Sequence, residues 1–227
     1  MQDGTDHDPH ADAARIEALF TRSDGRYRVA RWARPQVVAC FGLEDDAAQI
    51  MTDAVQAVAT LSGAGTAAED AELGVNTMIF ACTDWAELRA APGLDRLIPD
   101  IARLTAVLAA SGANQYRIFG FEPDDAGRPG AIRLSITLLR WDDDLARMSW
   151  RAVALAQAVH AALLWSDHAF TRASPVAEIE GTGRAVVVPF VQDVVRAAYH
   201  PDLPDAATDP AHAGLIVAHL GDAGSGA

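Results

Sequence analysis

The chain has 227 residues, half of them hydrophobic, which suits one ordinary domain that buries its own core without a disulfide or a structural metal. All 18 basic residues are arginine, so Schiff-base chemistry, pyridoxal phosphate anchoring and a P-loop lysine are excluded. The 31 acidic residues give a formal net charge of −13, which argues against nucleic acid and anionic membranes as partners.

The two ends of the chain differ in composition from its body. Residues 1–12 are polar and acidic and residues 221–227 are glycine-rich, so we expect two disordered tails around a single domain over 13–220. The start lacks the basic and apolar regions of a secretory signal, and no apolar stretch is long enough to cross a bilayer. A cytoplasmic protein is therefore expected, with its two cysteines reduced and buried as small apolar side chains.

Apolar runs alternate with helical periodicity in the first half of the chain. Residues 13–21, 45–62 and 94–110 place apolar side chains on one helical stripe, and each is predicted to be a helix. Residues 37–41 and 75–82 are short continuous apolar runs of the kind found in buried strands.

A hairpin followed by a long helix is the clearest local pattern. Residues 115–121 alternate in polarity, several turn-forming residues follow, and 131–140 form a second predicted strand. Ser149 is a suitable N-cap for a helix over 150–165. Further along we expect a short strand and two helices, at residues 185–188, 190–198 and 211–220. This order predicts an α/β or α+β fold: a mixed sheet, with helices on one side and a helical C-terminal tail.

Several motifs are tested and rejected. Gly63-Ala64-Gly65 follows a helix and lacks a third glycine, so it does not form a dinucleotide loop. The acidic run 142–144 lacks the ligand spacing of a calcium loop and is typical of a solvated turn. Neither cysteine lies in a zinc-binding spacing. The sequence therefore predicts no cofactor and no metal.

Four polar residues near the end of the long helix are the candidate catalytic or binding residues. Gln157 and His160 interrupt an alanine-rich helix, and Asp167 and His168 follow closely. His160 and Asp167 would lie about 10 Å apart on a continuous helix, too far to bind one metal unless the helix ends between them. The alternative is a buried structural histidine held by a hydrogen bond.

The order of elements resembles the N-terminal half of the zincin metalloproteases. The segments 31–38 and 75–80 are similar to the first two strands of such domains. The resemblance implies that the long helix carries the HExxH motif, in which two histidines bind zinc and the glutamate activates water. Here Ala156 and Gln157 stand at the places of the first histidine and the glutamate, and only His160 remains.

A closer resemblance is to a family of uncharacterised bacterial proteins, many described as lipoproteins, that also look zincin-like. It covers roughly residues 31–204 and includes Asp167 and the stretch 199–203. Because no lipoprotein signal is recognised in the sequence, we do not expect the family's envelope location for this chain. The resemblance implies a zincin-like domain that has lost peptide hydrolysis.

Three hypotheses follow. The first is a non-catalytic zincin-like domain that binds a small molecule, a peptide or a protein, and that is compatible with a homodimer. The second is a hydrolase with a noncanonical site formed by Gln157, His160, Asp167 and His168. The third is an unrelated structural or regulatory α/β domain. An open cleft beside Gln157 and His160 would favour binding or catalysis over a structural role.

Overall fold

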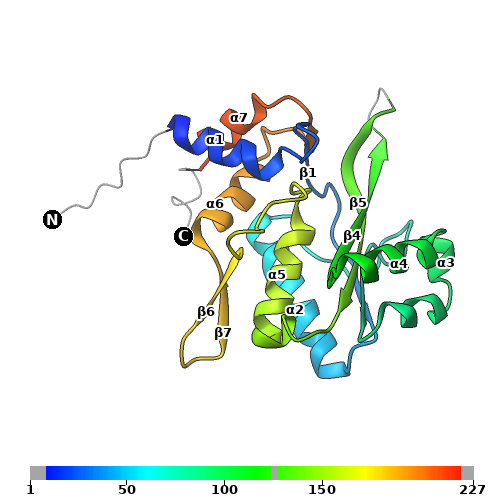
Figure 1. The fold of residues 1–227 in the computed structure, drawn as a ribbon. Helices are drawn as coiled ribbons and strands as arrows, with labels where there is room; N and C mark the ends of the chain where they lie inside the picture. Colours follow the sequence, from blue (N-terminus) through cyan, green and yellow to red (C-terminus); the bar gives the residue numbers. More distant parts are fainter. Residues whose placement is uncertain (1–8, 124–126, 221–227) are drawn as a thin grey trace.

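The computed structural model describes residues 9–123 and 127–220 (Figure 1). Residues 1–8 of the predicted tail at 1–12, and the whole predicted tail at 221–227, lie outside the described residues. Residues 9–12 were expected to belong to the acidic tail, and this is wrong, because they form the first turn of α1 (Pro9–Phe20).

A mixed four-stranded sheet confirms the predicted fold class. Its strands are β2 (Val38–Phe41), β3 (Thr77–Cys82), β4 (Gln115–Pro123) and β5 (Pro129–Arg140). Their order is β2-β3-β5-β4, with β2, β3 and β5 parallel and β4 antiparallel to β5 at one edge. The antiparallel pair is the predicted hairpin.

Helices cover both faces of this sheet, so the expectation of helices on one side is wrong. On one face lie α2 (Asp45–Ser62) and α5 (Trp150–Ala162), and on the other η1 (Trp85–Ala90), α3 (Leu94–Leu97) and α4 (Ile101–Ser111) (Figure 1). Successive strand residues point to opposite faces. Ile79 therefore packs with Met51 of α2, while Phe80 packs in the cluster that contains Trp85 of η1.

Two predicted helices differ from the expectation, one because it is interrupted and the other because it ends early. The helix predicted over 94–110 is broken at Pro99, which has no N–H to donate and which keeps the preceding Ile98 out of helical conformation (φ −128°, ψ 86°). The helix α5 stops at Ala162, because Leu163 is extended (φ −137°, ψ 156°) and the next residue donates its N–H to the carbonyl of Ala30 at 2.9 Å.

The C-terminal part adds a hairpin and two helices. Its elements are β6 (Val176–Ile179), β7 (Arg184–Val187), α6 (Pro189–Ala198), β8 (Ala206–Ala207) and α7 (His212–Ala218). The strand β7 and both helices were predicted, but β6 was not. The short strand β1 (Val29–Ala30) pairs with β8 and so connects the two ends of the chain.

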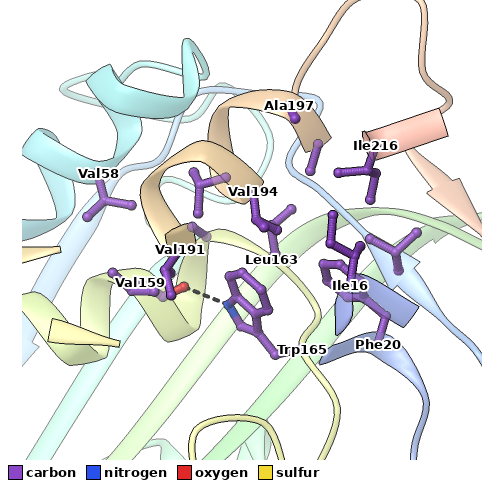
Figure 2. Close-up of a cluster of buried hydrophobic side chains, with 14 of the residues drawn as sticks. Ile16, Phe20, Val58, Val159, Leu163, Trp165, Val191, Val194, Ala197 and Ile216 are labelled. Carbon is purple, nitrogen blue, oxygen red and sulfur yellow. Dashed lines mark hydrogen bonds between the residues drawn. The ribbon is translucent and has the colours of Figure 1, made fainter. Parts of the chain in front are cut away.

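A large apolar cluster joins α1, α5, α6 and α7 (Figure 2). At its centre Trp165 stacks on Phe20, with ring centroids 5.2 Å apart and planes 9° from parallel. Its indole N–H donates to the carbonyl of Val159 at 2.8 Å. The helix α5 is thus packed between the sheet and the C-terminal helices, which explains why it is apolar on nearly every side.

Candidate functional site

A cavity of about 310 Å³ lies along α5, and we call it the α5 cavity. Its wall comes from α5, from the start of β4, from the short helix η2 (Leu145–Arg147) and from the loop 170–175. The polar lining residues are Gln115, Gln157, His160, Thr171, Arg172 and Ser174. The apolar ones include Leu145, Met148, Val153, Ala156, Phe170 and Pro175. Two of the four residues selected from the sequence, Gln157 and His160, therefore meet at one cavity.

His160 lies in the last turn of α5 and is partly exposed to the cavity. Its ring packs edge-on against Phe170, with centroids 5.3 Å apart and planes at 84°. Burial, and next the positive charge of Arg117, lower the pKa of His160 well below its usual value. The imidazole is neutral at pH 7 and offers the cavity one donor or one acceptor nitrogen.

Phe170 takes a strained backbone conformation at the rim of the cavity. Among the described residues it is the only one besides glycines with a positive φ, at 63°. A bulky side chain rarely adopts this conformation, and holding it costs of order 1–3 kcal/mol. Ring contacts with His160 and with Trp165, whose centroid is 4.9 Å away, hold it there. Strain of this kind is often found at binding sites.

Gln157 belongs to a hydrogen-bonded network that sequence analysis missed. The guanidinium of Arg117 donates to the side-chain oxygen of Gln115 at 2.8 Å and to that of Gln157. The amide nitrogen of Gln157 in turn donates to the oxygen of Gln115 at 3.2 Å. Gln157 is only 3% exposed, so this polar network lies at the floor of the cavity.

The sequence of β4 contains a pattern that could have indicated this network. Gln115 and Arg117 are two positions apart on one strand and therefore point to the same face. That face meets α5. A polar pair on the buried side of an edge strand indicates a polar partner in the helix that covers it.

Asp167 and His168 lie apart from the α5 cavity and do not line it. Asp167 accepts hydrogen bonds from the backbone N–H of Ser23, at 2.9 Å, and from the Ser23 hydroxyl. These bonds lower the pKa of Asp167 to about 2. His168 is exposed and has its Nδ1 3.3 Å from Asp167. The pair thus tethers the loop after α1.

The described residues contain one group of metal-ligating side chains, formed by His200, Asp202 and His219. The two imidazoles stack with centroids 3.7 Å apart and planes only 13° from parallel. A metal bound by an imidazole lies in the ring plane, about 2.0–2.1 Å from the nitrogen. Two nearly parallel planes at this separation do not meet at one ion. One ring would have to turn first, so the arrangement as it stands is not a metal site.

A second hollow, of about 410 Å³, lies between α2, α5 and the β6–β7 hairpin. Its polar wall consists of exposed side chains, among them Arg151, Thr182 and Arg184, and it holds no buried polar group. The α5 cavity is the better candidate because buried polar side chains converge on it.

The two cysteines are free thiols, and burial raises the pKa of both, that of Cys82 to about 12. Neither lines the α5 cavity.

No helix within the described ranges is both long and apolar enough to span a membrane. Comparison with protein-family models, curated proteins and solved structures finds no match. What this protein does must therefore be inferred from the cavity itself.

Proposed function

We propose that the chain is a non-catalytic binding protein whose small-molecule ligand occupies the α5 cavity. The observation that carries the proposal is the position of the cavity, directly against Ala156, Gln157 and His160. An apolar hollow of a few hundred Å³ with a few convergent polar groups is the usual form of a small-molecule site. His160 keeps partial exposure at the cavity, whereas a purely structural histidine would be sealed in the core.

The non-catalytic part of the proposal depends on what stands at the zincin-like positions. Zinc-dependent hydrolysis needs two histidines and a glutamate there, and this chain has Ala156, Gln157 and His160. The amide of Gln157 is committed to Gln115 and Arg117, and an amide does not take up a proton from water. These features support a degenerate zincin-like domain that has retained the cavity but not zinc-dependent hydrolysis.

A hydrolase centred on His160 is the second candidate, because a neutral imidazole facing a cavity is suited to act as a general base. Thr171 and Ser174 line the same cavity. Neither hydroxyl is hydrogen-bonded to His160 in the described part of the chain: that of Thr171 donates to the carbonyl of His168, and that of Ser174 accepts from Val176. Under our proposal, hydrolysis of p-nitrophenyl acetate is equal for the wild type and for His160→Ala.

The test is a fragment screen by ¹H–¹⁵N correlation NMR, with each hit mapped onto the structure. We expect hits to shift the signals of α5 and of the loop 170–175. Ala173→Trp should abolish them by placing an indole at the lining position. Ala177→Trp is the matched control, since Ala177 is also exposed but lies outside the cavity wall. Hits that map elsewhere, or that survive Ala173→Trp, would contradict the proposal.

We also propose that the protein is cytoplasmic and that its partner is neither nucleic acid nor a membrane. The acidic composition, with a net charge of −13, supports the exclusion of both polyanions. Two unpaired cysteines are consistent with a reducing compartment. A homodimer is compatible with the proposal, and sedimentation analysis would test it.

A further inference from the structure

Arg117 is a buried cation. Among the residues that the structure describes, its guanidinium bonds only to two neutral amide oxygens, those of Gln115 and Gln157, and its buried Nε finds no partner. No carboxylate pairs with it in the part of the chain that the structure describes. By contrast, Arg34 faces three carboxylates, Asp70, Glu72 and Glu122. Buried charges are normally paired, so this one is missing a negative partner.

The cation also fixes the orientation of both amides. A guanidinium has only donors, so Gln115 and Gln157 must turn their oxygens toward it. Gln157 then uses its nitrogen to donate to Gln115. The nitrogen of Gln115 makes no hydrogen bond with any described residue, and Gln115 lines the cavity. The cavity floor therefore offers amide N–H donors that the charge of Arg117 polarises.

The cavity wall carries no negative charge. None of its lining residues is Asp or Glu, although the whole chain has 31 acidic residues against 18 basic ones. Arg172 lies at the exposed rim, Arg117 lies behind the two amides, and His160 is neutral. A concave surface with low-dielectric walls and positive groups concentrates an anion from solution. The apolar part of the wall includes Leu145, Met148 and Phe170.

We infer that the α5 cavity binds a small organic anion, a monocarboxylate with an apolar body. Its carboxylate accepts from the amide nitrogen of Gln115, Arg117 supplies the neutralising charge, and the body packs on the apolar wall. The inference rests on the proposed function and narrows it to one ligand class. A monocarboxylate fits better than a phosphate, because a single buried cation matches a single charge and amides suit a planar acceptor.

The probes are phenylacetate and phenylacetamide, which have nearly the same shape and differ in charge. Each is titrated to about 10 mM, a range that detects the weak affinity of such small ligands, while the side-chain amide signals of Gln115 and Gln157 are followed by NMR. We expect phenylacetate to shift the Gln115 amide and to bind about tenfold or more tightly than phenylacetamide. Inorganic phosphate is expected not to bind.

The decisive variant is Gln115→Glu, which keeps the shape of the side chain and places a carboxylate beside Arg117. It should weaken phenylacetate binding about tenfold or more and change phenylacetamide binding much less, because the ligand amide can donate to the new carboxylate. Gln115 is partly exposed, so the fold should tolerate the change, and the NMR spectrum verifies this. Arg172→Gln at the exposed rim is a second variant that cannot disturb the core, and we expect a smaller loss.

The outcomes separate the inference from the proposed function. If the acid and the amide bind equally well, or if Gln115→Glu leaves the preference intact, the inference is overturned and the small-molecule site remains. Tighter binding of phosphate than of phenylacetate overturns the carboxylate class. If neither probe shifts any signal and the fragment screen is also empty, both the inference and the proposed function fail.

Discussion

Gln157 on α5 accepts a hydrogen bond from Arg117 on the edge strand β4, forty positions earlier in the chain. The bond joins the only side-chain amide of α5 to a buried positive charge. It links the sheet edge to the helix and at the same time forms the floor of the α5 cavity. The stability of this region and its capacity to bind a ligand should therefore change together.

Replacing Gln157 by Leu should destabilise the protein although the packing volume is nearly kept. The substitution removes one of the two acceptors of a buried guanidinium, and an unsatisfied charged donor costs about 1–3 kcal/mol or more. Gln157→Glu is the matched control, since it keeps shape and acceptor, and it should cost less at neutral pH. Urea denaturation followed by circular dichroism measures both. Equal stability of Gln157→Leu and the wild type would show that the bond contributes nothing.

The neutral imidazole of His160 predicts a loss of stability on mild acidification. Its pKa is lowered in the folded state, so as the pH falls below about 6.5 the unfolded chain takes up a proton that the folded chain refuses. Above that pH, His160 does not lower the free energy of unfolding. Below that pH, the free energy of unfolding falls by at most about 1.4 kcal/mol per pH unit for this one site.

His160→Gln tests this dependence directly. Between about pH 7.5 and about pH 5.5 the variant should lose less stability than the wild type, because the penalised protonation is removed. His168→Gln is the control for the substitution itself, because His168 is exposed and does not line the α5 cavity. His212, whose pKa burial also lowers, accounts for part of what remains in the variant. An unchanged slope in His160→Gln would mean that the folded protein protonates His160 freely.

Asp167 should matter for stability at neutral pH and not for ligand binding. Its pKa is lowered to about 2 by hydrogen bonds from Ser23, so its contribution is present above the unfolded value near 3.9 and is lost as the pH falls toward 2. The pair is exposed, so Asp167→Asn should cost only about 0.5–1 kcal/mol at pH 7. If this variant weakened phenylacetate binding as much as Gln115→Glu, Asp167 would belong to the site after all.

Local signals in the sequence predicted the elements whose ends are fixed by neighbouring residues. The bounds of α2 agree because Gly63 takes the left-handed conformation that ends a helix, with φ 78°. The start of α5 agrees because the Ser149 side chain accepts from the N–H of Ala152 at 3.2 Å. The end of α5 was wrong, because it is set by an extended pairing with Ala30, far away in the chain.

The candidate site follows the same division. Gln157 and His160 stand out within their own helix and were selected from the sequence, and both line the α5 cavity. Gln115 and Arg117 were missed because they reach Gln157 only when β4 lies against α5. That packing is determined by the tertiary fold. Asp167 and His168 were grouped with His160 by closeness in sequence, but the chain leaves the helix at Ala162 and takes them to Ser23.

Gly42 and Gly63 provide a matched pair that isolates a steric contact from backbone strain. Both have a left-handed backbone, with φ of 74° and 78°. A Cβ on Gly63 would meet nothing within 4 Å, whereas a Cβ on Gly42 would lie 2.1 Å from the carbonyl oxygen of Ala81 in β3. Gly63→Ala should therefore lower the free energy of unfolding by about 1–2 kcal/mol, because alanine is strained in the left-handed conformation.

Gly42→Ala carries the same strain and must also push β2 away from β3, so it should cost about 1–3 kcal/mol more. The parallel pairing of Phe41 with Phe80, whose rings stack at 4.6 Å, should loosen with it. Denaturation gives the two free energies, and amide hydrogen exchange at β2 and β3 locates the change. Equal costs for the two variants would show that the end of β2 can shift freely, and that the sheet edge does not depend on this contact.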